Sequence, residues 1–316
     1  MNGGPVAVVD CGTNTIRLLI AELDDHGRLR ELDRRMEIVR LGQEVDRTGE
    51  FHPDALQRTF AATERYAAVI RATAVAPDRI RFVATSASRD VANRDTFFAG
   101  IAERLGVTPE VITGDDEARL SFAGAVSATQ DHHPPVLVTD IGGGSTELII
   151  GRADGVVERS VSLDIGSVRL TERFWTTDPP STDDLRWATS YVDQLLDDQR
   201  WDWTGIRTWI GVAGTLTTLA AVDLGLVEYD RDRVNGHRVA VDDLTAITDR
   251  FAGLQVQQIR EIGSVHPQRA DVITAGALIA SRIAARLRVD ALTVSEADIL
   301  DGTALEMFTE DGRMPR

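Results

Sequence analysis

The sequence predicts an α/β protein with two domains of related plan, and three observations carry this prediction. The chain has 316 residues, enough for two domains that each bury a core of their own. A strand, a tight turn and a second strand are indicated at residues 6–21 and again, after an offset of 130 residues, at 136–151. Elsewhere strand-like runs alternate with stretches of helical periodicity, as in domains whose sheets are covered by helices.

The unit at 136–151 contains a glycine-rich turn between two carboxylates, which we call the second turn (Asp140–Glu147). Glycine leaves backbone N–H groups uncovered, so the turn can wrap a phosphate, and the hydroxyls of Ser145 and Thr146 are further donors. Asp140 and Glu147 flank the turn, where a magnesium ion bridging phosphate oxygens needs oxygen ligands. The glycines of this turn are Gly142, Gly143 and Gly144. The segment therefore predicts a phosphate-binding hairpin with a metal site beside it.

The unit at 6–21 repeats this plan around what we call the first turn (Asp10–Arg17). A gapless alignment of the two units gives these pairs: Asp10 with Asp140, Gly12 with Gly142, Thr15 with Ser145, and Arg17 with Glu147. The repetition predicts two related domains that each present a phosphate-binding hairpin to a common cleft. Chance similarity between two β-hairpins is the alternative, because Asp and Gly are common turn residues.

The composition is that of an acidic globular protein, with a net charge of −16 and 43% hydrophobic residues. All 34 basic residues are arginine, for which a genome-wide compositional bias is the simplest explanation. Phosphate must then be recognised by arginine side chains, helix N-termini and backbone amides. The acidic balance argues against broad nucleic-acid binding, because such binding needs a basic face.

Several absences narrow the location of the protein. No apolar run of about 18 residues occurs, so no membrane span is expected. The N-terminus enters a strand-like run without a basic, apolar leader. The single cysteine, Cys11, excludes an internal disulfide and cannot build a zinc site alone. These features favour the cytoplasm, and a homodimer is one expectation for the oligomeric state.

Cys11 and Arg17 also have the spacing of a cysteine phosphatase loop. Such a nucleophile needs a helix after the loop, whose N-terminus lowers the pKa of the thiol. Here an apolar strand follows Arg17, and Cys11 aligns with Ile141, an ordinary core residue. We therefore reject this interpretation.

The segment after the first hairpin adds one candidate for phosphate binding. Helices are predicted at 53–73 and 94–105, a pair of strands at 28–39 and a buried strand at 80–84. Arg89 follows that buried strand, where a side chain is well placed for a binding cleft. A surface arginine is the ordinary alternative.

Acidic residues precede the helical stretch at 120–128. Asp115 and Asp116 are expected to cap this helix, since negative charge is favourable at a helix N-terminus. Glu117, in the first turn, can instead point into the cleft and act as a base toward water.

Three further features of the sequence are candidate sites. Residues 208–218 indicate a strand, a glycine turn and a helix, whose N-terminus can contact a phosphate or nucleotide through Gly214 and Thr215. His132 and His133 lie in a proline-containing linker and are interpreted as solvated rather than as metal ligands. A cluster of tryptophans is interpreted as core or interface rather than as a base-stacking platform: Trp201, Trp203 and Trp209.

These motifs together resemble the exopolyphosphatase and guanosine pentaphosphate phosphohydrolase (Ppx/GppA) family of the actin, sugar kinase and heat-shock ATPase superfamily. The pair Asp-x-Gly-Gly-Gly-Ser-Thr-Glu and Gly-x-x-Glu-Ala-Arg is the specific part of the resemblance. The segments that carry it are 10–17, 40–42, 84–90, 114–119, 140–147, 211–215 and 269–271. The resemblance implies two ribonuclease-H-like domains around a central cleft, at 1–128 and 129–297, with the last helix (about 298–316) packing back on the first. It implies a short, two-domain type of the family.

The resemblance also implies roles for individual residues. Glu117 matches the base that activates water, and Asp140 and Glu147 match the carboxylates of a site for Mg²⁺ or Mn²⁺, to which we add Asp10. The phosphate-contacting positions are Gly12, Thr13, Asn14, Thr15, Arg17, Arg89, Gly142, Gly143, Gly144, Ser145 and Thr146, with Gly214 and Thr215 as further candidates. One departure concerns residues 299–302, where the family often has Leu-Arg-Glu-Gly and this chain has Ile-Leu-Asp-Gly. A basic contact there is therefore in doubt.

The function expected from these features is that of an exopolyphosphatase, which hydrolyses the terminal phosphate of inorganic polyphosphate with the help of a metal ion. Removal of the 5′ γ-phosphate of guanosine pentaphosphate is the first alternative, because the same residues would hold its terminal phosphoryl group. An ATP-using kinase or ATPase of the superfamily is the second, although the Gly-x-x-Glu-Ala-Arg segment favours hydrolysis. A sensor that binds a nucleotide or polyphosphate without chemistry is the third.

Overall fold

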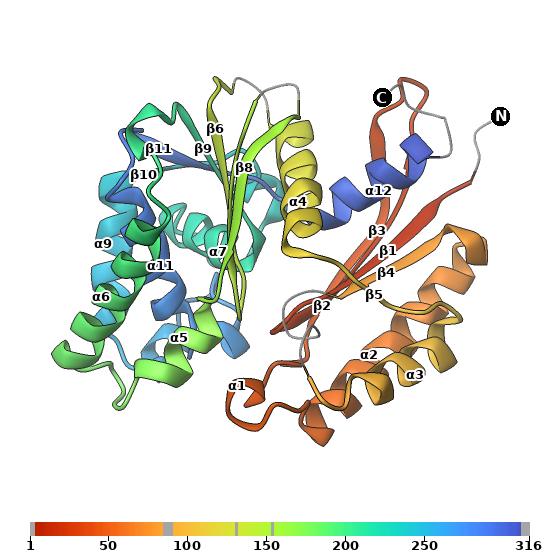
Figure 1. Ribbon diagram of the computed structural model, residues 1–316, viewed down its shortest axis with the longest axis horizontal. Coiled ribbons are helices and arrows are strands. Elements are labelled where there is room, and N and C mark those ends of the chain that lie inside the picture. Colours follow the sequence, from red (N-terminus) through yellow and green to blue (C-terminus); the bar gives the residue numbers. More distant parts are fainter. Residues whose placement is uncertain (1–3, 85–90, 130–131, 153–154, 311–316) are drawn as a thin grey trace. The chain divides into compact units, whose positions relative to one another are not determined.

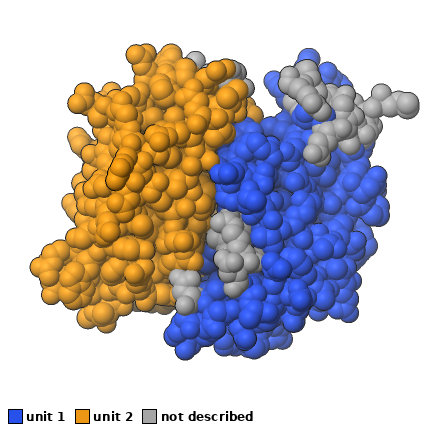
Figure 2. Space-filling view, in the orientation of Figure 1, with its two compact units in different colours: residues 1–124, 299–316 blue, residues 125–298 orange. Residues whose placement is uncertain are grey.

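The structure is a computed structural model that describes residues 4–84, 91–129, 132–152 and 155–310, and the chain divides into two compact units (Figures 1 and 2). Unit 1 comprises residues 1–124 and 299–316, and unit 2 comprises residues 125–298. The boundary falls within helix α4 (Gly114–Ala128). None of the helices in the described ranges is long and apolar enough to cross a membrane.

Unit 1 is built on a five-stranded mixed sheet with the strand order β3-β2-β1-β4-β5 (Figure 1). The strands are β1 (Val6–Cys11), β2 (Thr15–Leu23), β3 (Leu29–Ile38), β4 (Ile80–Ala84) and β5 (Glu110–Val111). The first three form an antiparallel meander, and β4 and β5 continue the sheet in parallel with β1. The helices, besides the first part of α4, are α1 (Val45–Thr48), α2 (Pro53–Ala72), α3 (Arg94–Leu105) and α12 (Ile299–Glu310).

Apolar layers cover both faces of this sheet, because successive residues of a strand point to opposite sides. Ala7, Val9 and Cys11 of β1 pack in the cluster that includes residues of α2 and α3. Val6 and Val8 pack on the other side, in the cluster that includes residues of α12. β1 is consequently buried on both faces, which explains why its sequence is an apolar run rather than an alternation.

Helix α12 is joined to unit 1 by a close backbone contact and by paired charges. Gly302 lies so near α4 that a Cβ atom on it would be 1.9 Å from the carbonyl oxygen of Leu120. Glu306 pairs with Arg81 of β4 at 2.5 Å and with Arg119 of α4 at 2.6 Å. The end of the chain is thus tied both to the sheet and to the helix that carries Glu117.

The segment at 299–302 builds the fold and presents no basic group. Leu300 is 1% exposed and packs with the apolar residues of β1 and with Phe308. Asp301 accepts a hydrogen bond from Nη2 of Arg34 at 2.6 Å. Leu300 is therefore a core residue, at a position where the resemblance led us to expect a basic side chain.

We expect Glu306→Gln to lower the stability of unit 1 in a pH-dependent way. Burial raises the pKa of Glu306, but hydrogen bonds from Arg81 and Arg119 outweigh this and hold the pKa below its ordinary value. A lowered pKa in the folded state means that the stabilisation is complete above the unfolded pKa of about 4.3 and is lost as pH falls through the folded value. Thermal unfolding should show a deficit of about 1 kcal/mol at pH 7 that shrinks below about pH 4. An equal loss of stability at pH 7 and below pH 4 would contradict a stabilising role for the ion pairs of Glu306 with Arg81 and Arg119.

Unit 2 is built on a six-stranded sheet with the order β10-β11-β9-β6-β7-β8 (Figure 1). The strands are β6 (Val136–Ile141), β7 (Thr146–Gly151), β8 (Val157–Leu163), β9 (Thr208–Val212), β10 (Arg238–Ala240) and β11 (Ala291–Val294). The α-helices are the end of α4, α5 (Ser167–Phe174), α6 (Thr182–Asp198), α7 (Ala213–Asp223), α8 (Arg231–Val234), α9 (Val241–Ala252), α10 (Val256–Arg260) and α11 (Ile273–Ala284). Residues of these helices and of the sheet share one large apolar core.

The two units repeat one sheet plan, so the predicted α/β fold with two related domains is confirmed. In each unit an antiparallel meander begins the sheet, and its first strand pairs in parallel with a later strand, β4 or β9. Unit 2 adds an antiparallel edge strand, β10, beside β11.

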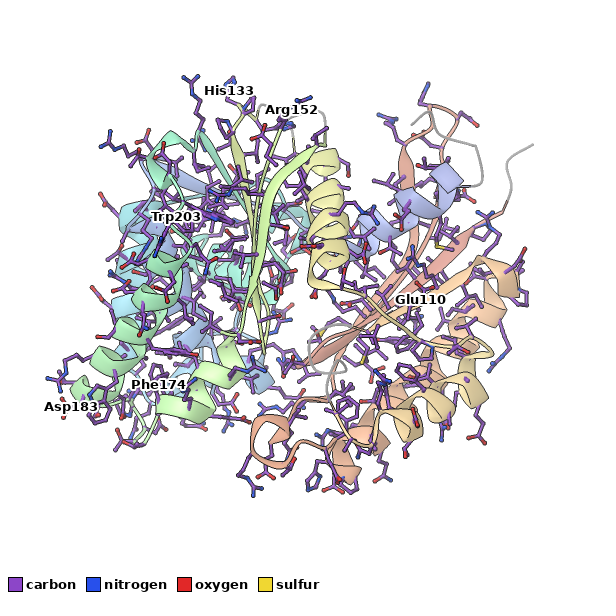
Figure 3. All side chains as sticks on the ribbon, viewed as in Figure 1. Glu110, His133, Arg152, Phe174, Asp183 and Trp203 are labelled. Carbon is purple, nitrogen blue, oxygen red and sulfur yellow. The ribbon has the colours of Figure 1, made fainter. Side chains whose placement is uncertain are left out.

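Some of the predicted helices and strands are confirmed by the structure, and one prediction is wrong. The helices predicted at 53–73 and 94–105 are confirmed as α2 and α3. The predicted pair of strands at 28–39 is wrong, because these residues form the single edge strand β3. Trp203 and Trp209 belong to the core of unit 2, and Figure 3 shows Trp203 among the side chains of that unit.

Candidate active site

The two predicted phosphate-binding turns are closed by equivalent hydrogen bonds. The N–H of Gly12 donates to the carbonyl oxygen of Thr15 at 3.0 Å, and the N–H of Gly142 donates to that of Ser145 at 3.0 Å. The gapless alignment of the two hairpins is therefore reproduced in three dimensions. Gly12 and Gly142 thus use their amides to close the turns.

The first turn neutralises its own carboxylate. Asp10 and Arg17 lie directly opposite each other on β1 and β2. Nε and Nη2 of Arg17 donate to Oδ2 of Asp10 at 3.0 and 2.7 Å. Asp10 is buried, whereas the Arg17 side chain keeps 17% of its surface exposed. The pairing orients Arg17, and it makes Asp10 a weaker candidate for a metal ligand than a carboxylate without an arginine across the strand.

The tip of the first turn is held by the segment that follows β3. The carbonyl oxygen of Thr13 accepts the N–H of Gly42 at 2.8 Å, and that of Asn14 accepts those of Val39 and Arg40 at 3.0 and 2.9 Å. A Cβ atom on Gly42 would be 2.2 Å from Cγ2 of Thr13. Both carbonyl groups of the tip thus face residues 39–42.

The second turn carries two carboxylates at the positions where the first turn has a salt bridge. Asp140 and Glu147 lie directly opposite each other on β6 and β7, so their side chains share one face of the sheet. Asp140 is 8% exposed and Glu147 is 2% exposed. Oε1 of Glu147 accepts the hydroxyl of Ser162 on β8 at 2.8 Å.

This carboxylate pair fits a divalent cation. Two buried like charges on opposing strand positions repel each other, and a cation between them offsets that cost. Mg²⁺ commonly takes one or two protein carboxylates and completes its shell with water and substrate phosphate oxygens. No group of three or more His, Cys, Asp or Glu side chains among the described residues is arranged to hold a metal ion. Asp140 and Glu147 supply two carboxylates, so a metal held there would take its other ligands from water and phosphate oxygens.

The second turn is backed by the start of α5. The carbonyl oxygen of Gly142 accepts the N–H of Ser167 at 2.9 Å, and that of Gly143 accepts those of Val168 and Arg169 at 2.9 and 3.1 Å. Gly166, immediately before the helix, would place a Cβ atom 2.4 Å from the carbonyl carbon of Gly143. No feature of the sequence connects these residues with the turn, and their role was not predicted.

Two of the predicted hydroxyl donors are engaged with backbone carbonyls. Oγ1 of Thr146 donates to the carbonyl oxygen of Ile165 at 2.7 Å. Oγ1 of Thr215 donates to that of Ile141, at the end of β6, at 2.8 Å. Thr146 thus ties the second turn to the segment between β8 and α5, and Thr215 ties the start of α7 to the end of β6.

The start of α7 is occupied by an arginine that the sequence did not single out for a role. Nη1 of Arg269 donates to the carbonyl oxygen of Gly214 at 2.6 Å and to Oγ1 of Thr218 at 3.3 Å. A Cβ atom on Gly214 would be 2.1 Å from that same Nη1, so a larger residue here would require the guanidinium group to move. Ala213, the residue before, has a φ of 63°, a left-handed conformation that is strained for alanine. Gly214 thus contributes space for Arg269 at this helix end.

Glu117 lies in the first turn of α4 and is 7% exposed. Its N–H donates to the carbonyl oxygen of Thr113 at 3.0 Å. The hydroxyl of Thr113 accepts the N–H of Asp116 at 3.1 Å and donates to Oδ2 of that residue at 2.7 Å. Thr113 is therefore the capping residue, with Asp116 as its reciprocal partner, and this local network fixes the helical turn that carries Glu117.

The candidate residues are divided between the two units. Unit 1 contains Asp10, the first turn and Glu117, and unit 2 contains the second turn, Gly214 and Thr215. Arg89 lies outside the described residues.

Cys11 and His133, the two other candidate groups, are held by contacts within the fold. Cys11 is fully buried; burial, and then the neighbouring Asp10 carboxylate, raise the pKa of its thiol well above the ordinary value, which does not suit a nucleophile. Backbone groups of His133 exchange hydrogen bonds with the hydroxyl of Thr208 at 2.8 and 2.9 Å. Figure 3 shows His133 at one end of unit 2 and Phe174 of α5 at the opposite end.

The repeated sheets, each with a glycine-containing turn beside a buried carboxylate, define the chain as a two-domain α/β protein of duplicated plan. The model of the Ppx/GppA phosphatase family matches residues 19–310. The chain belongs to this family.

Individual relatives agree with this assignment over nearly full length. Exopolyphosphatase 2 of Mycobacterium tuberculosis is 44% identical over 316 residues, which cover 96% of this chain and 98% of that protein. The crystal structure of an exopolyphosphatase-like protein matches with a TM-score of 0.91 and 42% identity, covering 96% of this chain and 97% of the other. A Ppx/GppA family member of Aquifex aeolicus matches with a TM-score of 0.84 and 29% identity, covering 98% and 99% of the two chains.

Proposed function

We propose that the protein is an exopolyphosphatase, which hydrolyses the terminal phosphoanhydride bond of inorganic polyphosphate and releases orthophosphate. The observation that carries the proposal is the second turn, where Asp140 and Glu147 oppose each other beside a run of glycine amides. The full-length similarity to a protein named exopolyphosphatase 2 supports polyphosphate as the substrate.

Different residues bind the phosphate, hold the metal ion and shape the second turn. The amides of Gly143 and Gly144 bind the oxygens of the terminal phosphoryl group, and Arg17 adds charge-assisted donors from the first turn. Asp140 and Glu147 hold Mg²⁺ or Mn²⁺, which when bound offsets the negative charge of the phosphate oxygens. Thr146 and Thr215 keep their hydroxyls on carbonyl oxygens and shape the turn. Thr13, Asn14, Thr15, Ser145, Gly214 and Arg89 stay further candidates for phosphate contacts.

The chemical step is an attack of water on the terminal phosphorus. Glu117 orients the water and accepts its proton, a new P–O bond forms, and the bond to the bridging oxygen breaks. The bridging oxygen leaves with the shortened chain and keeps the electron pair. We place this reaction in the cytoplasm, in keeping with the single, buried cysteine.

A substrate panel tests the proposal. Orthophosphate release is measured with long-chain polyphosphate, tripolyphosphate, guanosine pentaphosphate and ATP, each with Mg²⁺, Mn²⁺ or a chelator. We expect the highest kcat/KM with polyphosphate and no release with the chelator, because charge on the transferred group must be offset. Faster release from guanosine pentaphosphate would favour the nucleotide as substrate, and ATP consumption that requires an acceptor would indicate a kinase. Tight polyphosphate binding without release would indicate a sensor.

A further inference from the structure

The peptide groups of the second turn have a defined direction. The carbonyl groups of Gly142 and Gly143 both point to the first-turn amides of α5, at 2.9–3.1 Å. In a trans peptide the carbonyl and the following N–H point in opposite directions. The N–H groups of Gly143 and Gly144 therefore point away from α5, side by side. Two parallel amides of this kind form a concave donor set for an anion.

Gly166 fixes how closely α5 approaches these peptides. A Cβ atom at this position would be 2.4 Å from the carbonyl carbon and oxygen of Gly143 and 2.5 Å from the nitrogen of Gly144. These are backbone atoms, which cannot rotate away as a side chain can. Any residue other than glycine must displace the turn, the helix start, or both.

The first turn is backed in the same way. Its carbonyl groups point to the segment that follows β3, and Gly42 would place a Cβ atom 2.2 Å from Cγ2 of Thr13. In both units, then, a glycine a few residues after the third strand lies against the turn between the first two strands. The repetition indicates that the contact belongs to the shared plan of the hairpins and is not a local accident of unit 2.

We propose that Gly166 is a positioning residue: together with the first amides of α5 it aims the N–H groups of Gly143 and Gly144 at the terminal phosphoryl group. Gly42 has the corresponding role for the first turn. The inference rests on the proposed function, since it assigns these residues to the site that binds the phosphate. It extends the site to the segment Gly166–Arg169, which acts through its contacts with the second turn.

The variant Gly166→Ala tests the role, with Gly253→Ala as the matched control. Gly253 is in the same unit, has a φ of −94°, and would place its Cβ no nearer than 3.7 Å to another atom, an ordinary contact. For Gly166→Ala we expect kcat/KM for polyphosphate to fall on the order of 10²-fold, the usual cost of a displacement of about 1 Å in a binding geometry. KM, and the Ki for orthophosphate as a competitive inhibitor, should rise at least about tenfold, while Gly253→Ala should match the wild type.

The split between KM and kcat distinguishes positioning from simple loss of folded protein. If kcat falls while KM and the orthophosphate Ki keep their wild-type values, or if all three are unchanged, the positioning role is refuted. Should Gly166→Ala fail to fold, Gly42→Ala takes its place, because its clash is with a threonine side chain that can rotate. A rise of about threefold in KM and Ki is then expected, and unchanged values refute the role. Wild-type protein that releases no orthophosphate from polyphosphate would instead overturn the proposed function.

Discussion

Replacement of Glu117 by glutamine is expected to lower kcat for polyphosphate hydrolysis on the order of 10²–10⁴-fold, the range for loss of a general base. Glutamine keeps the size of the side chain and its hydrogen-bonding oxygen, but it cannot accept the proton of the attacking water. The residue is buried in a helical turn fixed by Thr113 and Asp116, so the substitution should leave the fold intact. Orthophosphate release under saturating substrate measures the effect.

The control is Glu110→Gln, the same chemical change on an exposed residue of unit 1 (Figure 3). It should keep near-wild-type kcat. The pH profile adds a second criterion: an acidic limb of kcat/KM is expected for the wild type, and loss of the base should remove it. Near-full activity of a folded Glu117→Gln protein would rule out the assignment.

The second large effect is expected at the carboxylate pair of the second turn. Asp140→Asn or Glu147→Gln should lower kcat/KM on the order of 10²–10³-fold, because a metal ion contributes several kcal/mol of charge stabilisation. The same substitutions should reduce the rise in thermal midpoint that added Mg²⁺ produces, because a ligand stabilises the folded state more when it binds more tightly.

Glu158→Gln provides the matched control for this pair, since it is an exposed glutamate on β8 of the same sheet. Glu158→Gln should change neither kcat/KM nor the thermal midpoint. Titration of activity with Mg²⁺ gives a further measure, because loss of one ligand should shift the half-saturating metal concentration upward. Substitutions that lower the metal-free midpoint and leave the metal requirement unchanged would show that the pair has only a structural role.

The hairpins were predictable because their signal is local and occurs twice. Apolar runs, a turn-forming Asp and closely spaced glycines specify strand, turn and strand without any long-range contact. The alignment of Asp10 with Asp140 then gave the register that both sheets show. Helices α2 and α3 were equally predictable from the sequence, since each combines helical periodicity with a clear N-terminal or C-terminal boundary.

The contacts between distant segments were not predictable from the same signals. Gly166 has no positive φ and no turn motif that would distinguish it, and its importance comes only from the nearness of Gly143. The need for glycine at position 302 was likewise not predictable, because it arises from the nearby carbonyl oxygen of Leu120. Residues 28–39 were predicted to form two strands, but they form the single edge strand β3, and an edge strand tolerates charged side chains along its length.

The opposite charges at one register position, Arg17 and Glu147, have an evolutionary consequence. Two hairpins with the same closure and register are most simply descended from one ancestral hairpin that was duplicated. After the duplication one copy came to hold an arginine and the other a glutamate at the same register position, so that the two hairpins diverged to opposite charge. An exchange of the two residues would then fail as a pair, because each copy has since adapted its own surroundings to the charge it carries.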